Sequence, residues 1–507
     1  MRLTLGIDSS TQGVKAVAWD VDAGKVVFSA SVNYGRDLPQ YGSPDGFLVP
    51  GAGCLVPGAE DLVRHADPRM WIEGLELVLA RLQATGCPMG GIAAIGGDAQ
   101  QHATVYLSEA GVEALGLQSR VSSPLETDKL SSWFSRPTSP IWMDSSTGAE
   151  CAALDAKFGA RLQTDTGSPA IERFAGPQIM KFAKEDPEGY AKTKRIHLLS
   201  SFLASYLVGE DMPIDTGDGA GMNLLNLKTG EWDAAICEAV ATGLAGKLPK
   251  VTRNIRNTRN TVLDQPSVAS GRDLRVGECC ESLPLKPYFA KFGLTPGIPV
   301  VPFTGDNPAS LVGCCAEKPG TAVISLGTSD VFFAAMDSFH TDPDGYGHVF
   351  GNPMGGFMSL SCFKNGSLAR DRVRRELGVD WTFFDEGAFL VTEKPSARAP
   401  TGRVRAFPYF ETEITPKHDA TGIEANFDWA GADAATKIRA IVEGQVANMY
   451  ERTRWIGDFS EIMVTGGASR SKGIRETIAS VFKAKVTTID VPDSAAVGGA
   501  RLAALVV

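Results

Sequence analysis

The same strand–turn–strand pattern opens both halves of this chain, and this duplication limits the fold more than any other feature of the sequence. In the first half, residues 2–8 (RLTLGID) alternate in polarity, and a second apolar run, VKAVAWD, follows the turn SSTQG. In the second half, residues 321–336 (TAVISLGTSDVFFAAM) repeat the order of strand, Gly-Thr-Ser turn and strand. Alternation predicts strands, and a repeat separated by more than half the chain predicts a duplicated α/β domain rather than a short-period array.

Composition agrees with two or more domains and excludes some classes of partner. A chain of 507 residues with 43% hydrophobic residues can bury more than one core. The formal net charge of -10 argues against nucleic acid as the main partner. Nine cysteines without zinc-ligand spacing are typical of thiols in a reducing compartment. A strand begins almost at the first residue and no apolar run approaches the length of a membrane span, so we expect a cytosolic protein without a membrane partner.

Periodicity and turn residues predict the remaining elements of both halves. Helices are expected over residues 70–84 and 435–457 and from residues 473 and 494, and strands over 26–34, 92–95, 461–465 and 485–489. Surface loops are expected over residues 35–67 and 116–139. Residues 215–225 (DTGDGAGMNLL) are expected to form a turn that leads into a strand, and the polar residues 253–287 are expected to close the first half.

The stretch VVPFTGDNPASLVG, residues 300–313, gives the strongest indication of chemistry. Apolar residues lead into Gly305, and small and apolar residues follow Pro308, which predicts a buried strand, a tight turn and a helix. Asp306 and Asn307 then lie at a strand end, where a carboxylate can accept a proton from a hydroxyl group and an amide can orient the same substrate. Taken alone, an Asp here more often caps the following helix, so its role depends on the other motifs.

The turn from Asp8 to Gly13 is suited to phosphate. It combines a carboxylate, three hydroxyl groups and a glycine. Backbone N–H groups and hydroxyls in such a turn can cradle phosphate, and Asp8 can bind a magnesium ion, which prefers oxygen ligands. An ordinary polar hairpin turn is the commoner case for a single match.

Two further motifs have side chains or backbone suited to ligands. In GDAQQHATVYL, Gln101 and His102 fall between two strands and form a donor and acceptor pair suited to a polyol, although a single histidine is more often structural. The predicted strand at residues 461–465 runs into Gly466 and Gly467. Two glycines at a helix start let a planar or anionic group approach the backbone closely.

Together these motifs resemble a known family. LGIDSSTQGVKAVAWD, GDAQQHATVYL, FTGDNPASL, ISLGTSD and VTGGASRS are similar to motifs of the FGGY carbohydrate kinases. Within that family, RDLPQYG, IWMDSST, IERFAG, GMNLL and CFKNGSL resemble the xylulokinases, particularly their longer eukaryotic-type branch. The motifs span residues 3–500, and their combination is specific although no single motif is.

The resemblance implies a fold and an activity. The fold is α/β, with duplicated ribonuclease-H-like (actin-like ATPase) domains and a cleft between them. Residues 1–300 form the N-terminal, sugar-binding domain and residues 301–507 the C-terminal, nucleotide-binding domain, with a hinge near residue 300. The activity is phosphorylation of D-xylulose at O5 with ATP and Mg²⁺. A small-molecule sugar is then the expected partner, with a homodimer as one possible assembly.

The resemblance also implies roles for individual residues. Asp306 matches the general base, which also contacts the sugar, and Asp8 matches the magnesium-linked aspartate. The residues matched to other sugar contacts are Gln101, His102, Arg173 and Asn307. The residues matched to nucleotide contacts are Thr11, Gly327, Thr328 and Ser329 in the phosphate-binding turns, Gly466, Gly467 and Ser471 on the adenine side, and Trp381 as an aromatic contact.

An ordinary aspartate pKa of about 3.9 leads us to expect Asp306 to be ionised at neutral pH. Three alternatives to the xylulose kinase stay open at this point. A sister kinase would act on another ketopentose, such as ribulose, or on a polyol. An actin-like or chaperone-like ATPase would bind a protein partner and hydrolyse ATP without sugar. A catalytically silent sugar sensor would bind its ligand without turnover.

Overall fold

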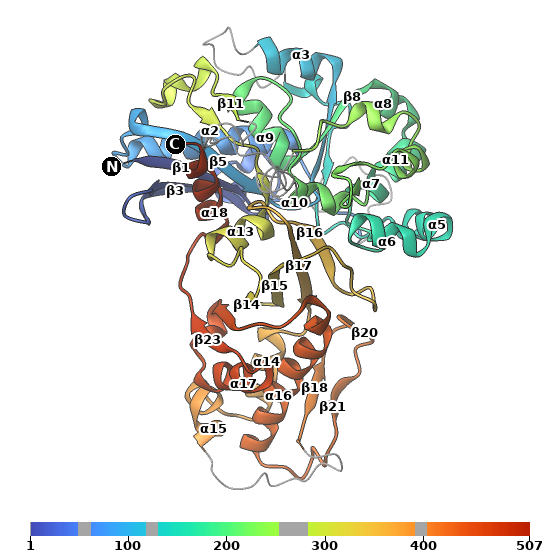
Figure 1. Ribbon diagram of the computed structural model, residues 1–507, viewed down its shortest axis with the longest axis vertical. Coiled ribbons are helices and arrows are strands. Elements are labelled where there is room, and N and C mark those ends of the chain that lie inside the picture. Colours follow the sequence, from blue (N-terminus) through green and yellow to red (C-terminus); the bar gives the residue numbers. More distant parts are fainter. Residues whose placement is uncertain (1, 49–61, 118–129, 253–281, 391–402) are drawn as a thin grey trace, which may run out of the picture. The chain divides into compact units, whose positions relative to one another are not determined.

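The computed structural model describes residues 2–48, 62–117, 130–252, 282–390 and 403–507, which form two compact units (Figure 1). Unit 1 contains residues 1–313, 350–357 and 493–507, and unit 2 contains residues 314–349 and 358–492. Unit 1 therefore includes both ends of the chain.

The centre of unit 1 is a sheet that, in the described residues, has seven strands in the order β11-β12-β5-β1-β2-β3, with β13 paired to β5. Their bounds are Leu3–Ser9 (β1), Gly13–Asp20 (β2), Lys25–Asn33 (β3), Ile92–Ala99 (β5), Leu283–Pro284 (β11), Pro299–Val300 (β12) and Thr304–Gly305 (β13). Strands β1, β2 and β3 lie where the sequence predicts strands and form an antiparallel meander, whereas β5 runs parallel to β1.

Helices α2 (Pro68–Ala84) and α9 (Leu199–Val208) supply much of the core of unit 1. Helix α2 confirms the helix predicted over residues 70–84 and begins two residues earlier. The Asp67 side chain caps it by accepting from the Arg69 N–H, and Pro68 occupies the first turn, where its missing N–H is not needed. The apolar face of α2 is fully buried at Trp71, Leu75, Val78, Leu79 and Leu82.

The other elements of unit 1 surround this core. They are α1 (Tyr34–Asp37), β4 (His65–Ala66), β6 (Thr104–Ser108), α3 (Glu109–Leu117), β7 (Ser139–Pro140), α5 (Gly148–Phe158), α6 (Ala160–Thr166), α7 (Ala175–Glu185), α8 (Pro187–Lys192), β8 (Thr193–Leu198), α10 (Thr216–Gly219), β9 (Leu225–Asn226), β10 (Glu231–Trp232), α11 (Ala234–Val240), α13 (Asp306–Gly313) and α18 (Ser494–Ala503). Short 3₁₀-helical turns, labelled η, join several of them, among them η5 (Ala220–Met222).

Helix α18 packs against α13 and against the sheet at β1 and β5 (Figure 1). The approach is close because the facing residues are small. A Cβ added to Gly498 would lie 1.9 Å from the carbonyl oxygen of Ala309 on α13, and one added to Gly6 on β1 would lie 1.8 Å from that of Ala496. Helix α13 begins at Asp306, so this glycine packing fixes the position of the predicted general base.

Unit 2 repeats the arrangement of unit 1, as the duplicated pattern predicts. Its main sheet has the strand order β16-β17-β15-β14-β22-β23, with β14 antiparallel to β15 and parallel to β22. The bounds of the strands are Thr321–Leu326 (β14), Asp330–Met336 (β15), His348–Gly351 (β16), Phe357–Phe363 (β17), Glu461–Thr465 (β22) and Lys485–Thr488 (β23). In both units a hairpin supplies the central strand, and a parallel strand from later in the chain lies beside it.

Helices and two small hairpins complete unit 2. They are α14 (Ser367–Glu376), α15 (Ala388–Leu390), β18 (Ala406–Tyr409), β19 (Glu413–Ile414), β20 (Lys417–His418), β21 (Gly422–Ala425), α16 (Ala434–Thr453) and α17 (Lys472–Phe482). The helix predicted over residues 435–457 is present as α16 but ends four residues earlier, where a 3₁₀ turn (Arg454–Ile456) follows.

The expected division at residue 300 into a sugar-binding and a nucleotide-binding domain concerns bound ligands and stays a prediction, as does the hinge there. The surface loops predicted over residues 35–67 and 116–139, and the polar segment 253–287 predicted to close the first half, fall partly outside the described residues. No helix in the described ranges is long and apolar enough to cross a membrane.

We predict that Gly498→Ala lowers the free energy of unfolding, because the added Cβ would meet backbone atoms of Ala309 that have no room to move. Overpacking of this kind typically costs about 1–3 kcal/mol. Urea denaturation followed by tryptophan fluorescence measures the change. Gly148→Ala is the control, because a Cβ there would meet nothing within 4 Å; it should change stability by less than about 0.5 kcal/mol. Equal midpoints for both variants would contradict the packing.

Candidate functional site

Three neighbouring strands of unit 1 end at the same edge of the sheet, and each brings an aspartate there. Asp8 on β1 is the register partner of Asp98 on β5, and Asp98 is the partner of Thr304 on β13, which leads directly into Asp306. Ligands of open α/β sheets commonly bind outside the carboxyl ends of parallel strands. The edge formed by Asp8, Asp98 and Asp306 is therefore the candidate site of unit 1.

Asp306 is held at this edge by a set of N–H donors. Its Oδ1 accepts from the backbone N–H and the side-chain amide of Asn307, at 2.8 and 2.9 Å, and the backbone N–H of Gln101 also donates to the carboxylate. Burial, together with the charge of Asp8, nevertheless raises the pKa of Asp306 to about 7. The expectation from the ordinary pKa was therefore wrong, because it ignored how much water this edge excludes.

The pKa values of the neighbouring carboxyl groups, Asp8 and Asp98, are also raised by burial. Burial raises the pKa of Asp8 to about 6, although a hydrogen bond with Asp98 and the charge of Lys15 act in the opposite direction. Asp98 is completely buried, and its pKa lies well above the ordinary value because of burial and of the charges on Asp8 and Asp306.

The carboxylate of Asp8 could bind a magnesium ion here. Asp8 is half-buried at the end of β1, as the sequence predicts. In the part of the chain that the structure describes, no three His, Cys, Asp or Glu side chains are grouped so that they could hold a metal ion by themselves. Mg²⁺ commonly takes only one or two protein carboxylates and completes its shell with substrate phosphates and water. Asp8 fits that mode of binding.

Gln101 links Asp306 and Asn307 to the rest of unit 1. Its Oε1 accepts from the amide of Asn307 at 3.0 Å, and its Nε2 points to the carbonyl oxygen of Gly217 at 3.5 Å. The carboxamide of Gln101 thus fixes the orientation of Asn307. The structure brings Gln101 into direct contact with Asn307, which lies 206 positions later in the sequence, next to Asp306.

His102 lies next to this group in an unusual backbone conformation. Its φ of 71° is in the left-handed region, which costs a non-glycine residue roughly 1–2 kcal/mol. The imidazole is stacked on the buried ring of Phe174, with centroids 4.5 Å apart, and its Nδ1 lies 3.0 Å from the carbonyl oxygen of Gly221. Strain of this kind persists where neighbours fix a residue, and it is common at ligand sites.

Arg173 lies beside the same aromatic ring. Its guanidinium is 5.8 Å from the centroid of Phe174, and its side chain is half-buried. The side chains of Arg173 and His102 thus both lie against the ring of Phe174.

Behind these residues lies the segment 215–225, where the sequence predicts a turn into a strand. The strand is present as β9, but a short helix, α10, and the 3₁₀ turn η5 occupy the place of the predicted turn. Asp215 caps α10, and its Oδ2 accepts from the Gly217 N–H at 2.7 Å and from the Thr304 hydroxyl at 2.6 Å. The segment therefore holds the strand end that precedes Asp306.

Asp218, within α10, is almost completely buried. Its carboxylate accepts a hydrogen bond from the Ser200 hydroxyl at 2.5 Å. Burial raises its pKa well above the ordinary value, and the charges of Asp306 and Asp215 act in the same direction.

Thr11, predicted to bind phosphate, lies in the turn between β1 and β2. Its hydroxyl accepts from the indole N–H of Trp142 at 2.8 Å and donates to Gln100 Oε1 at 3.2 Å. Trp142 is 45% exposed, which is unusual for so large an apolar side chain.

The sequence did not lead us to assign a role to Asp98, Phe174, Asp218 or Gly221. Asp98 carries a usable signal, because it is a charged residue inside the apolar strand IAAIGGDA. Phe174 and Gly221 lie in the motifs IERFAG and GMNLL, but a phenylalanine and a glycine carry no chemical group that indicates a role there.

Unit 2 brings its predicted residues to one end of its own sheet. The turn Gly327 to Ser329 joins β14 to β15, and Thr328 at its tip is exposed. The Ser367 N–H donates to the Gly327 carbonyl at 3.0 Å, and a Cβ on Gly366 would lie within 2.8 Å of the turn backbone. The start of α14 therefore supports this turn.

Gly466 meets the same turn from β22. It has a φ of 87°, and a Cβ on it would lie 2.6 Å from the carbonyl oxygen of Leu326, so glycine is required there for two reasons. Gly466 and Gly467 are both exposed. The two glycine-bearing turns that the sequence singled out are thus adjacent within unit 2.

Ser471 and Trp381 differ in accessibility. Ser471 is buried, and its hydroxyl accepts from the Ile474 N–H at 3.4 Å, which caps α17. Trp381 is 45% exposed, and the guanidinium of Arg374 lies 4.8 Å from its ring centroid. Trp381 therefore offers an accessible aromatic ring, whereas Ser471 offers a helix cap.

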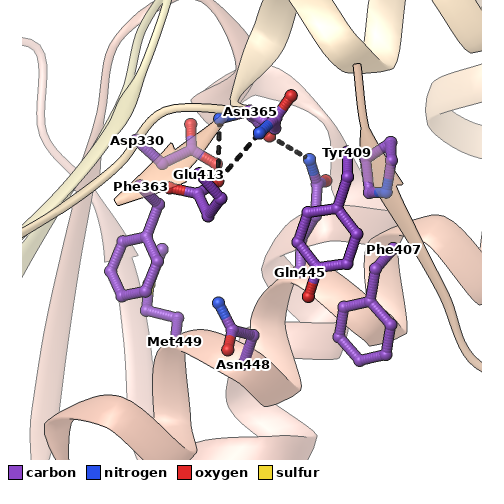
Figure 2. A pocket seen from close by; sticks show the side chains of 10 residues that line it. Asp330, Phe363, Asn365, Phe407, Tyr409, Glu413, Gln445, Asn448 and Met449 are labelled. Carbon is purple, nitrogen blue, oxygen red and sulfur yellow. Dashed lines mark hydrogen bonds between the residues drawn. The ribbon is translucent and has the colours of Figure 1, made fainter. Parts of the chain in front are cut away.

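Unit 2 also contains a hollow between α16 and the end of β17 (Figure 2). Apolar rings and Met449 line its sides, and polar groups lie at its top. Glu413 accepts two hydrogen bonds from Asn365, each of 3.0 Å, and the Gln445 amide donates to the Asn365 carbonyl at 2.6 Å. Because these groups are bonded to one another, we assign no ligand to the hollow.

Comparison with known proteins gives matches over nearly the whole chain. Residues 136–271 match the sequence model of the N-terminal domain of the FGGY family of carbohydrate kinases, and residues 322–507 match that of the C-terminal domain. The chain is 36% identical over 514 residues to a xylulose kinase of Rattus norvegicus, and the alignment covers 98% of this chain and 87% of the relative. It is 34% identical over 526 residues to xylulose kinase 2 of Arabidopsis thaliana, and this alignment covers 99% of this chain and 87% of the relative.

A solved structure agrees with the fold. The crystal structure of a xyloylose kinase from Brucella ovis aligns with a TM-score of 0.76 over 99% of this chain and 90% of that chain. The two sequences are 23% identical, so this likeness concerns the fold alone.

The buried carboxyl of Asp218 predicts a pH dependence of stability. Because its folded pKa lies above that of the unfolded chain, folding takes up a proton. Its contribution to stability is therefore present below about pH 3.9 and is lost as the pH rises towards the folded pKa. Asp218→Asn cannot ionise, so its stability relative to the wild type should increase between about pH 4 and pH 8. Urea denaturation at several pH values measures the difference.

Asp37→Asn is the control of opposite sign. Arg36 and Arg81 hold the pKa of Asp37 well below its usual range, so its contribution is present above about pH 3.9 and is lost at lower pH. This variant should be less stable than the wild type at neutral pH, with the difference closing in acid. A stability difference for Asp218→Asn that does not change with pH would show that burial leaves its pKa unshifted.

Proposed function

This chain belongs to the FGGY family of carbohydrate kinases, and we propose that it transfers a phosphoryl group from ATP to O5 of D-xylulose, giving D-xylulose 5-phosphate and ADP. Xylulose kinases at 34–36% identity over nearly its whole length support this substrate. The structural observation that carries the proposal is the half-buried Asp306, held by N–H donors at a sheet edge next to Gln101, Asn307 and His102. We further propose a cytosolic enzyme with no nucleic-acid or membrane partner.

Asp306 is the proposed general base. As the oxygen of the sugar hydroxyl forms its bond to the γ-phosphorus, the bond to the leaving ADP oxygen breaks and the hydroxyl proton passes to Asp306. A base is most effective when its pKa lies near the working pH, which agrees with a pKa of about 7 for this carboxyl. Phosphoryl transfer requires mainly positioning and charge stabilisation beyond that proton transfer.

The sugar is the proposed ligand of the edge around Asp306. His102 and Arg173 would contact its hydroxyl groups, since the side chains of both lie against the ring of Phe174. Asn307 would orient the same substrate. The carboxamide of Gln101 is bonded to Asn307, so we propose that Gln101 supports the sugar site through Asn307.

The nucleotide is the proposed ligand of unit 2. The turn formed by Gly327, the exposed Thr328 and the half-buried Ser329 would bind phosphate, and the exposed Gly466 and Gly467 would let adenine approach. Trp381 is proposed to contact the nucleotide with its accessible ring. Ser471, matched to an adenine contact, would act by capping α17 just beyond the glycines.

Asp8 and Thr11 of unit 1 are proposed to serve the phosphates. Asp8 would hold Mg²⁺ with its half-buried carboxylate, and the Thr11 hydroxyl, already ordered by Trp142, would lie near the transferred group. When bound, the ion would offset negative charge on the phosphates.

The substrate is tested by a panel of sugars with a coupled assay for ADP release. D-Xylulose should give the highest kcat/KM, and ribulose, glycerol and the other polyols should give lower values. ADP release without any sugar should be negligible. A higher kcat/KM with another ketopentose would assign the chain to a sister kinase, and undiminished hydrolysis without sugar would indicate an ATPase.

Asp306→Ala should abolish turnover and leave nucleotide binding intact, because the base is lost while unit 2 is untouched. ADP affinity by calorimetry and kcat by the coupled assay separate the two effects. Asp306→Asn is the matched variant, since it keeps the shape and the N–H contacts but cannot accept the proton. Retention of more than about a tenth of the wild-type kcat, a barrier change below roughly 1.4 kcal/mol, would remove Asp306 from the role of base.

A further inference from the structure

A buried ion pair adjoins the turn that joins β14 to β15. Asp330 is the first residue of β15 and the register partner of Leu326, so residues 327–329 alone separate the two strands. Both oxygens of its carboxylate accept from one guanidinium: Nη1 of Arg370 donates to Oδ2 at 2.7 Å, and Nη2 donates to Oδ1 at 2.8 Å. Each of the two residues is 3% exposed. The ion pair is therefore bidentate and almost completely excluded from water.

The same guanidinium joins two helices to β15. Arg370 lies on α14, and its Nη2 also donates to the Ser367 hydroxyl at 2.8 Å, at the start of that helix. Its Nη1 also donates to Oε1 of Gln445 on α16 at 3.1 Å. Gln445 is itself fixed, since its amide donates to the Asn365 carbonyl (Figure 2). One side chain thus holds Asp330 relative to both helices.

The turn itself lies against the start of α14. The Ser367 N–H donates to the Gly327 carbonyl, and a Cβ on Gly366 would lie 2.7 Å from the backbone nitrogen of Asp330. Ser367 is therefore bonded to the turn through its N–H and to Arg370 through its hydroxyl. Arg370 thus supports the first end of the turn through Ser367 and the last end through Asp330.

Stability alone is a weak reason for such a pair. Burying two charges costs much of the free energy that their attraction returns, and replacing a buried ion pair by apolar residues of similar size is often neutral or stabilising. Apolar contacts are not directional, however, whereas the planar fork of an arginine fixes both the distance and the orientation of a carboxylate. The pair of Asp330 and Arg370 therefore supplies a geometry that an apolar pair would not.

We propose that Arg370 is a positioning residue for the nucleotide: through Asp330 and Ser367 it holds residues 327–329 in the conformation that binds phosphate. The inference rests on the proposed function, because it takes this turn to be a phosphate site. It adds that affinity for the phosphate groups depends on a buried side chain whose charge is already paired. Loss of the pair should then weaken the binding of the phosphates and leave the binding of adenosine unchanged.

Hydrogen exchange without any ligand tests whether Arg370 holds the turn. The double variant Arg370→Met/Asp330→Leu replaces the pair with apolar side chains of similar size, and its midpoint in urea should be close to that of the wild type. We expect the amides of a peptide spanning residues 324–332 to exchange about tenfold faster in this variant, with those of β22 unchanged. A peptide that exchanges as in the wild type would overturn the inference.

Affinities for ADP and for adenosine test the link to phosphate. The double variant should bind ADP about tenfold more weakly by calorimetry, while adenosine, measured by competition, should bind within about twofold of its wild-type affinity. KM for ATP should rise by a similar factor, with KM for the sugar unchanged. An equal loss for ADP and adenosine would indicate a general disturbance of unit 2, and an undiminished affinity for ADP would leave the pair a role in stability alone. Either result contradicts the proposal.

Arg370→Lys separates charge from geometry and serves as a second variant if the double variant does not fold. A lysine keeps the positive charge beside Asp330 but lacks the planar fork. Its affinity for ADP should be lower than that of the wild type, and its turn should exchange faster. Wild-type values for both would show that charge is sufficient and would overturn the role given to the guanidinium.

Arg375→Met is the matched control on the same helix. The guanidinium of Arg375 pairs with Asp371 at 3.0 Å, but its side chain is 64% exposed. ADP affinity and exchange of the turn should both stay within about twofold of the wild type. A loss equal to that of the double variant would mean that any lost charge on α14 weakens nucleotide binding, against the proposal. If the wild type has no affinity for ADP, the proposed function fails, whereas the exchange measurement still decides whether Arg370 holds the turn.

Discussion

Carboxyl groups gathered where most water is excluded are the constraint on which the rest of unit 1 depends. Asp8, Asp98 and Asp306 lie on adjacent strand ends, and burial raises the pKa of each. The charge of Asp8 raises the pKa of Asp98 and of Asp306 further. Hydrogen-bond donors offset part of the cost of burying these charges: the N–H groups of Asn307 and Gln101 donate to the carboxylate of Asp306. The same burial that disfavours charge gives one of these carboxyls a pKa near neutrality, which is useful in a base. Stability and reactivity are thus opposed at one place in the sheet.

Most of the fold could be predicted from the sequence, because it follows from local periodicity. Alternating apolar residues placed β1, β2, β14 and β15 correctly, helical spacing placed α2 and α16, and the repeat of the opening hairpin predicted two related sheets. The family and the α/β duplicated fold expected from the motifs are confirmed. The helix at residues 216–219 was missed, since four residues rich in glycine have no helical periodicity, and the bond from Asp215 to Thr304 that stabilises it joins distant parts of the chain.

The candidate site was partly predictable. Asp306, Asn307, Gln101 and His102 were named from turn chemistry, and the structure brings Gln101 against Asp306 and Asn307; their roles with substrate stay predictions. What the sequence could not give is what surrounds them. The stacking of Phe174 on His102 and the carbonyl of Gly221 come from segments 72 and 119 positions away, and the pKa of Asp306 depends on water exclusion that only folding creates.

The return of α18 to unit 1 has a consequence for the order in which the chain can fold. This helix covers β1 and β5 and packs on α13, yet it lies after the whole of unit 2 in the sequence. During synthesis on the ribosome, β1 and β5 leave the exit tunnel hundreds of residues before their covering helix exists. The face that contains Gly6 and Gly96 must therefore wait uncovered, and small glycines expose less apolar surface to wrong partners than larger residues would. The N-terminal half becomes complete only when the last part of the chain has been made.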